Sequence, residues 1–330
     1  MQFPDLQSPL VVVVGPTAVG KTDISIRLAR VLNGEIVSAD SRLFYRSLDI
    51  GTAKPSLEER RVVPHHLIDV ADPDEEWSLA VFQSKAKQTI HEIQSRGKLP
   101  FLVGGTGQYI RAVIEEWELP PQKPDYKLRA ILEKLGEEIG PKELHRQLSA
   151  IDPEAAMRIE PGNLRRTIRA IEVMLKTGYR FSQLSKKRAS PFSKLIIGLN
   201  RPRPELYDRI DNRINIMIRT GFIDEVRGLL QRGYSPSLTS LSAIGYRELI
   251  EYLQEKISLE EAVKEMKRLS RQYVRRQANW FKLNDPEIHW FNMDPDPLNQ
   301  IVDLTGDKAK WSLPRVSEYP WIQGHSIGHL

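Results

Sequence analysis

Residues Gly15 to Thr22 read GPTAVGKT, which fits the phosphate-loop pattern G-x-x-x-x-G-K-[ST]. The loop follows the apolar run Leu10 to Val14 and precedes Asp23 to Leu32, which has helical spacing. This strand, loop and helix predict a parallel α/β sheet in which backbone N–H groups of the loop face an anion at the helix N-terminus. We predict that the whole loop binds a diphosphate or nucleotide: Gly15, Pro16, Thr17, Ala18, Val19, Gly20, Lys21 and Thr22.

Two side chains of the loop have specific expected roles. Lys21 supplies a full positive charge, and Thr22 offers a hydroxyl to Mg²⁺ or to a bridging phosphate oxygen. The pattern indicates a ligand with a chain of phosphates, but it does not distinguish ATP from another diphosphate. The chemistry must therefore be inferred from other motifs.

Further apolar segments predict more strands of the same sheet: Glu35 to Ala39, Leu67 to Val70, Pro100 to Val103 and Lys194 to Leu199. Helical spacing is found over Asn163 to Lys176, Leu206 to Arg219, Asp224 to Arg232, Ser242 to Gln254 and Leu259 to Phe281. We predict a P-loop NTPase-like parallel sheet flanked by helices, with a helical insertion and a mostly helical C-terminal half. The expected boundaries are 1–120 and 160–204 for the core, 121–159 for the insertion, 205–284 for the helical region and 285–330 for an irregular tail.

Composition narrows the class of protein. The chain has 330 residues, 40% of them hydrophobic, and no cysteine, which excludes disulfides, thiolate nucleophiles and cysteine-ligated metal clusters. The absence of cysteine and of a signal peptide makes the cytosol the expected location. The run Leu10 to Val14 is far shorter than the ~20 residues of a membrane helix, so no membrane association is expected. The net charge of +5 permits an anionic partner, and we expect a monomer because no coiled-coil or repeat pattern is present.

Polar groups follow two of the other predicted strands. Asp40 comes directly after the second strand, so it is expected at the carboxyl edge of the sheet beside the loop. There it could accept a proton or bind Mg²⁺, or it could simply cap the next turn. Residues Gly104 to Tyr109 follow the fourth strand, and their glycines leave room beside the site, although a plain tight turn is the alternative.

Basic side chains recur at helical spacing in three segments. Arg165, Arg166 and Arg169 span little more than one turn, and Arg209 and Arg213 share a helix face. These groups suit phosphate binding, and a solvated surface is an equal alternative for both sets. A third stripe suits a nucleic-acid backbone or a solvated helix face: Lys264, Arg268, Arg271 and Arg275.

In order and spacing, a set of motifs resembles the tRNA dimethylallyltransferase family over about Leu10 to Lys282. These motifs are GPTAVGKT, SADSRLFY, IGTAKP, HHLIDVADP, LVGGTGQYI, NLRRTIRAIEV, RIDNRI, AIGYREL and RQYVRRQANWF. The resemblance implies transfer of a dimethylallyl group from dimethylallyl diphosphate to the exocyclic amine of the adenosine that follows the anticodon of tRNA. Pyrophosphate is released, with Mg²⁺ present.

By position, the resemblance implies a catalytic set in which Asp40 is the general base, Thr22 and Lys21 contact the diphosphate, and Arg213 binds it. It implies contacts with the tRNA anticodon stem-loop from Asp40, Ser41, Arg42, Leu43, Thr106, Arg129, Asn163, Leu164, Arg165, Arg166, Thr167, Ser242, Ala243, Ile244, Gly245, Tyr246 and Arg247. Leu43 departs from the family, which commonly has Gln there. The absence of cysteine excludes the zinc-finger extension of eukaryotic relatives, and the chain resembles the bacterial type.

Physical chemistry is consistent with these implied roles, and it also leaves alternatives open. An adenine amine is a weak nucleophile, so a carboxylate that accepts its proton assists the attack, while cations stabilise the departing pyrophosphate. The insertion, near Lys127 to Leu148, is a candidate cover that excludes water. A phosphate loop with Asp40 and a helical lid also suits a small-molecule or nucleotide kinase, and a noncatalytic RNA-binding ATPase is a third possibility.

Overall fold

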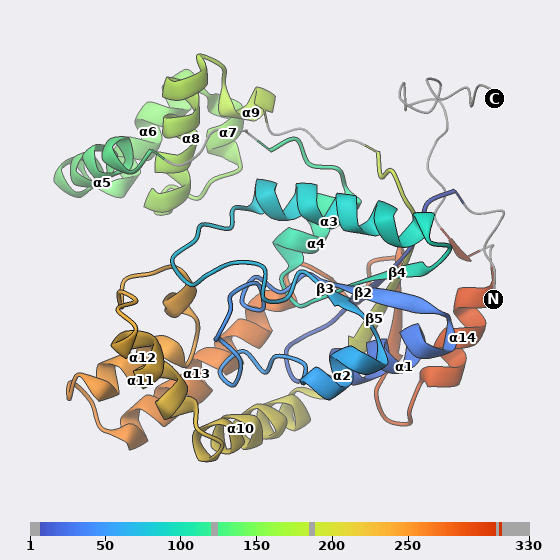
Figure 1. Ribbon diagram of the computed structural model, residues 1–330. Coiled ribbons are helices and arrows are strands. Elements are labelled where there is room, and N and C mark those ends of the chain that lie inside the picture. Colours follow the sequence, from blue (N-terminus) through green and yellow to red (C-terminus); the bar gives the residue numbers. More distant parts are fainter. Residues whose placement is uncertain (1–6, 120–124, 185–188, 308–309, 312–330) are drawn as a thin grey trace, which may run out of the picture. The chain divides into compact units, whose positions relative to one another are not determined.

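The computed structural model describes residues 7–119, 125–184, 189–307 and 310–311 of the chain. The chain forms two compact units, one of residues 1–114 with 190–330 and one of residues 115–189. The first contains the sheet, and the second is helical (Figure 1). No helix in the described residues is long and apolar enough to cross a membrane.

The first unit is built on a parallel sheet that has six strands within the described residues, in the order β3-β2-β4-β1-β5-β6 (Figure 1). Their bounds are Pro9–Val14 for β1, Gly34–Ser38 for β2, His65–His66 for β3, Leu99–Val103 for β4, Ser193–Asn200 for β5 and Ile288–Asn292 for β6. In β1, residues Leu10 to Val14 are completely buried because the sheet is covered on both faces. The predicted parallel α/β core is therefore confirmed.

Helices on the two faces of the sheet complete this unit. The helices within the first half are α1 (Lys21–Val31), α2 (Leu57–Val62), α3 (Leu79–Ser95) and α4 (Gly107–Ile114). Figure 1 shows α1 and α3 on opposite sides of the sheet. The C-terminal half is mostly helical, as predicted, with α10 (Arg203–Arg219), α11 (Phe222–Gln231), α12 (Tyr246–Leu253), α13 (Leu259–Gln277) and α14 (Leu298–Gly306).

Two elements have boundaries that differ from the predicted ones, because residues at those boundaries have positive φ values. The third strand is His65–His66 instead of Leu67 to Val70, because Leu67 and Asp69 have φ values of 60° and 56°, which no strand residue adopts. The helix predicted from Ser242 begins only at Tyr246, because Gly245 has a φ of 101° and forms its N-terminal cap. A single turn of 3-10 helix, Ser240–Ser242, precedes it.

The predicted irregular tail, 285–330, contains two regular elements. Strand β6 pairs with β5, and α14 packs against α1. The strand IHWFN lies at the edge of the sheet and only its first residue is buried, so its sequence has little of the apolar character of a central strand. The remainder of that tail, 312–330, lies outside the described residues.

The second unit is larger than the predicted insertion 121–159. It contains α5 (Tyr126–Ile139), α6 (Pro141–Ile151), α7 (Pro153–Met157), α8 (Leu164–Thr177) and α9 (Phe181–Leu184). Helix α8 was correctly placed but wrongly assigned to the sheet core, because its apolar face packs on α5 and α6. Their shared core includes Leu132, Leu144, Leu148 and Ile168. The proline-rich start, 120–124, lies outside the described residues.

Candidate active site

The phosphate loop joins β1 to α1 at the carboxyl edge of the sheet. Gly20 forms the N-terminal cap of α1 with a φ of 113°, a conformation that favours glycine. At Gly15 a Cβ atom would lie 2.7 Å from the carbonyl oxygen of Leu199, so β5 leaves no room for a side chain there. The loop therefore presents its backbone, as an anion site at a helix N-terminus requires.

Three side chains from other elements hold the loop. The Arg209 Nε of α10 donates to the Ala18 carbonyl at 2.8 Å, and the Arg201 Nε after β5 donates to the Val19 carbonyl at 3.0 Å. The Gln277 Oε1 of α13 accepts from the Thr17 N–H at 2.8 Å. These three contacts hold the loop in place from several sides. Electrostatic catalysis requires polar groups that are already held in position before the reaction.

Lys21 lies among charged groups at the start of α1. Its Nζ donates to the carbonyls of Gly15 at 3.0 Å and Pro16 at 2.8 Å, and it has no carboxylate partner within the described residues. Burial lowers the pKa of Lys21 to about 8, the Asp40 carboxylate raises it, and the Arg213 guanidinium lowers it. The charges of Asp40 and Arg213 both act on Lys21, so the three groups lie close enough to interact.

Asp40 both caps a turn and faces a cavity. Its Oδ1 accepts from the Arg42 N–H at 3.0 Å, so the capping alternative is correct for one oxygen. Asp40 also lines a small cavity of about 60 Å³ together with Lys21, Thr22 and Leu43. Within the described residues, Oδ2 has no hydrogen-bond partner and is available for a ligand.

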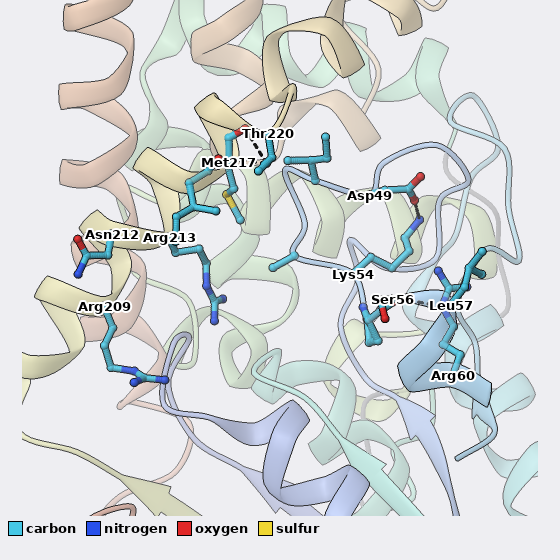
Figure 2. Close-up of a pocket in the computed structure, with 14 residues that line it drawn as sticks. Asp49, Lys54, Ser56, Leu57, Arg60, Arg209, Asn212, Arg213, Met217 and Thr220 are labelled. Carbon is cyan, nitrogen blue, oxygen red and sulfur yellow. Dashed lines mark hydrogen bonds and ion pairs between the residues drawn. The ribbon is translucent and has the colours of Figure 1, made fainter. Parts of the chain in front are cut away.

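Arg213 reaches from α10 into a larger cavity of about 680 Å³ (Figure 2). Burial lowers the pKa of its guanidinium from the ordinary value, and the neighbouring Arg209 lowers it further. Among the described residues Arg213 has no hydrogen-bond or ion-pair partner. Pro55 lines both cavities, so they share a wall. A half-buried cation without a counter-charge at such a place favours an anionic ligand.

The wall opposite α10 contains Lys54. Its side chain is only 1% exposed and forms ion pairs with Asp49 at 2.5 Å and Asp69 at 2.6 Å. Figure 2 shows the pair with Asp49 at the side of the cavity. Since both partners are carboxylates, Lys54 supports the loop instead of offering a free charge.

The glycine loop after β4 packs closely against β2 and α13. A Cβ atom at Gly104 would lie 2.5 Å from the Ala39 carbonyl oxygen, directly before Asp40. Thr106 contacts the Tyr273 hydroxyl, whose pKa is raised by burial and by the Asp40 carboxylate. The loop therefore allows β2, β4 and α13 to approach closely beside Asp40, and the plain-turn alternative is insufficient.

The residues after Asp40 are tied to the segment before α12. Arg42 donates to the Thr239 carbonyl at 2.7 Å and lies 3.4 Å from the Ser242 hydroxyl. Among the predicted tRNA-contact residues of this region, the exposed or half-buried ones are Ser41, Arg42, Leu43, Ser242, Ile244 and Arg247, and the buried ones are Ala243, Gly245 and Tyr246. The buried group supports the fold, since the Tyr246 hydroxyl donates to Glu225 at 2.6 Å.

In the helical unit, the predicted contact residues differ strongly in exposure. Arg129 is paired with the fully buried Glu172 at 2.9 Å, and Arg169 with the same carboxylate at 2.7 Å. Thr167 is buried and donates to the carbonyl of Asn163, the N-cap of α8, while Leu164 packs on the unit's core. Arg165 and Arg166 are exposed at the first turn of α8, and no described residue pairs with either guanidinium.

Comparisons with known proteins show which family this chain belongs to. The family model of the IPP transferases matches residues 43–284. A tRNA dimethylallyltransferase of Roseiflexus castenholzii is 52% identical, covering 91% of this chain and 99% of its own. That of Thermomicrobium roseum is 47% identical, covering 87% of each chain. The chain belongs to the IPP transferase family.

Solved structures of IPP transferases agree with this assignment. The full-length tRNA isopentenylpyrophosphate transferase from Bacillus halodurans has a TM-score of 0.69 and 46% identity, with 91% of this chain and 96% of that chain covered. A eukaryotic dimethylallyltransferase, described as acting on tRNA, has a TM-score of 0.77 and 29% identity, with 91% and 79% covered. The predicted family resemblance is confirmed.

Two side chains of the basic stripe on α13 form ion pairs within this IPP transferase. Arg271 pairs with Asp211 of α10 at 2.6 Å and stacks over Tyr207, and Arg268 pairs with Glu265. Two of its four charges are therefore neutralised within the protein. Instead, α13 contributes Gln277 and Tyr273 to the site. Gln277 was not singled out in the sequence, because one glutamine in an amphipathic basic helix forms no distinctive pattern.

The oxygen donors near Asp40 are compatible with Mg²⁺. The described residues contain no group of three or more His, Cys, Asp or Glu side chains that could hold a metal alone. Mg²⁺ characteristically takes one or two protein oxygens and completes its shell with water and substrate phosphates. Thr22 and Asp40 line one cavity with Ser25, whose buried hydroxyl has no partner among the described residues. This oxygen set fits a substrate-bound ion and does not fit an all-protein cage.

Proposed function

We propose that this chain transfers a dimethylallyl group from dimethylallyl diphosphate to the exocyclic amine of the adenosine following the anticodon in tRNA, and releases pyrophosphate. The observation that carries the proposal is the Arg213 guanidinium, half-buried and without a counter-charge, electrostatically coupled to Lys21 beside Asp40. Cations and a carboxylate at one point suit a reaction that expels an anion while a proton leaves the nucleophile.

The phosphate loop binds the leaving group in this proposal. As the carbon–oxygen bond of the donor breaks, negative charge develops on pyrophosphate, and Lys21 and Arg213 stabilise it. The Gly15 and Pro16 carbonyls hold Lys21 before the donor arrives, so little reorganisation of this charge accompanies the reaction. Thr22 would hold Mg²⁺, which supplies further positive charge to the diphosphate.

Asp40 is the proposed general base. The adenine amine forms a bond to the allylic carbon and gives one proton to the unpartnered Oδ2, while Oδ1 stays fixed by the Arg42 N–H. The target adenine must leave the stack of the anticodon loop, which costs a few kcal/mol and less in a loop than in a duplex. The hydrogen bond that Oδ1 accepts from the Arg42 N–H orients the carboxylate for that proton transfer.

Binding of tRNA rests on exposed basic groups in this proposal. Arg165 and Arg166 lie at the first turn of α8 and have no carboxylate partner in the described residues, so they are available to RNA phosphates. We propose the anticodon stem-loop as the element they contact, and a monomer as the active form.

Incubation with labelled dimethylallyl diphosphate and tRNA, without ATP, tests the function directly. We expect label in the tRNA and release of pyrophosphate, and both should depend on Lys21. A Lys21→Ala variant should lose most activity while tRNA affinity changes little, because Lys21 contacts the donor. Phosphate transfer that requires ATP would instead support a kinase and would overturn the proposal.

A further inference from the structure

The large cavity at Arg213, about 680 Å³ in volume, has an apolar wall to which the proposed reaction assigns no role. On α10, the residues that line it include Arg209, Arg213, Ile216, Met217 and Thr220. Successive spacings of four, three, one and three residues place these side chains on one face of the helix. Along that face the two cations come first, and the apolar side chains follow over the next two turns, about 10 Å along the axis.

The facing wall, just before and at the start of α2, is apolar as well. It includes Ile50, Ala53, Pro55 and Leu57, and Figure 2 shows Leu57 on the side of the cavity away from α10. Leu57 is 63% exposed and Ile216 is 55% exposed, and within the described residues neither belongs to the apolar core of the first unit. Two large apolar side chains from separate elements therefore line one cavity and stay open to solvent, where an apolar ligand could cover them.

The positive charges differ between the two walls. Beside Leu57, Arg60 forms an ion pair with Asp69 at 2.6 Å, so its charge is compensated. On α10, the Arg213 guanidinium has no ion-pair or hydrogen-bond partner among the described residues. The cavity thus combines one uncompensated cation with an apolar surface that begins one turn further along the same helix face. This combination suits an anion that carries an apolar chain.

We propose that this cavity binds allylic diphosphates longer than the dimethylallyl donor, with the diphosphate at Arg213 and the chain between Ile216 and Leu57. A dimethylallyl group is too short to cover the whole face, whereas a second isoprene unit reaches its far part. Asp40 lines the smaller cavity and is not among the described residues that line this one, so a ligand held here lies apart from the proposed general base. The longer diphosphate therefore competes with the donor and is not transferred. This inference rests on the proposed function, since both ligands use Arg213.

Calorimetry without tRNA tests the chain site with inorganic pyrophosphate, dimethylallyl diphosphate and geranyl diphosphate. Each buried CH₂ group raises affinity roughly fourfold, so partial burial of the added isoprene unit should make geranyl diphosphate bind about tenfold more tightly than dimethylallyl diphosphate. Ile216→Gln and Leu57→Gln place a polar group on either wall. Each should reduce this gain by about threefold or more and leave pyrophosphate affinity unchanged. Both positions are exposed, so the thermal melts should stay close to that of the unmodified protein.

The matched control is Leu175→Gln. Leu175 is 65% exposed on α8 in the helical unit, so the same substitution there should leave all three affinities unchanged. Arg213→Met separates the charge from the chain, because it should weaken all three anions by a similar factor and keep their order. In transfer assays, geranyl diphosphate should raise the apparent KM for dimethylallyl diphosphate and leave turnover at saturating donor unchanged.

The outcomes distinguish failure of this inference from failure of the proposed function. Geranyl diphosphate that binds no more tightly than dimethylallyl diphosphate, or a gain that both glutamine variants retain, would overturn the inference and leave prenyl transfer in place. Incorporation of the geranyl group into tRNA would also overturn it, because the chain would then start beside Asp40. If the unmodified protein binds none of the three anions, the donor site is wrong, and the proposed function fails together with the inference.

Discussion

The two units of the chain treat buried charge in opposite ways. In the helical unit, Glu172 is 0% exposed, and it accepts from Arg129, Arg169 and the Asp125 N–H. In the sheet unit, Arg213 is half-buried, yet no carboxylate or hydrogen-bond partner for it is present in the described residues. Both groups lie in motifs that carry the family resemblance.

The difference shows which charge serves the fold and which is available to a ligand. Burial alone would raise the pKa of Glu172, but the bonds from Arg129, Asp125 and Arg169 hold it below its ordinary value, so the carboxylate is fully compensated. Burial lowers the pKa of Arg213, and no carboxylate among the described residues compensates its charge. Burying a charge without a counter-charge costs free energy. A bound anion removes this cost because it supplies the counter-charge.

Asp40→Asn gives the largest expected effect on the sheet unit. Asparagine keeps the size and the acceptor for Arg42 but cannot take a full proton at neutral pH. Turnover should fall by roughly 10²–10⁴-fold with donor and tRNA dissociation constants nearly unchanged, measured by single-turnover transfer and by binding. Recovery at high Mg²⁺ together with weaker donor binding would assign Asp40 to the metal, and normal turnover would exclude both roles.

Arg213→Met tests the uncompensated charge directly. Methionine fills much of the same space without a charge, so donor affinity should fall by roughly 10–100-fold, as expected for a lost bond to an ionised group. The melting temperature should stay constant or rise, because an unpaired half-buried cation has been removed. Lower stability with unchanged donor affinity would show that Arg213 serves the fold, like Glu172.

The sequence predicted local patterns well and long-range contacts poorly. The phosphate loop, β1 and α8 were placed because their signals lie within a few neighbouring residues. The tie between Thr17 and Gln277 joins residues 260 positions apart, and no local pattern specifies it. The assignment of α8 to the helical unit likewise depended on which helices its apolar face meets.

The predicted roles of single residues show the same contrast between local patterns and long-range contacts. Arg209 and Arg213 were paired by spacing, but only the fold shows that one holds the loop at Ala18 and the other faces a cavity. The predicted contact residues Thr167 and Tyr246 lie in motifs, yet both are buried and support packing. Motif membership therefore does not separate packing residues from free ones, whereas burial and hydrogen-bond partners show which side chains are free to act.

Glu172→Gln tests the compensated charge. Glutamine leaves Arg129 and Arg169 without a counter-charge, so the unfolding free energy of the helical unit should fall by about 1–3 kcal/mol. Hydrogen exchange in residues 125–184 can follow this locally. Donor affinity should not change, because the pair belongs to the helical unit alone. A loss of donor affinity as large as that of Arg213→Met would contradict the division between the units.

The pH dependence of donor binding tests the role of the Lys21 charge in the unmodified protein. Its pKa is lowered to about 8, so the side chain is charged below pH 8 and neutral above it. Donor affinity should be constant at lower pH and fall as pH rises through 8, approaching tenfold per unit when one proton is taken up on binding. Lys21→Arg stays charged over this range and should flatten the profile. An unmodified protein without a break near pH 8 would contradict the assignment.

Arg165→Ala and Arg166→Ala should give the smallest effects, confined to tRNA affinity. Each removes an exposed charge without a partner in the described residues, so if each neutralises one phosphate, the slope of log affinity against log salt should become shallower by about 0.7–0.9. Turnover at saturating tRNA should not change. Arg146→Ala is the matched control in the same unit, because Arg146 is also exposed but already paired with Glu143 at 2.6 Å. Equal slopes for all three variants and the unmodified protein would make α8 a solvated surface and place the tRNA contact elsewhere.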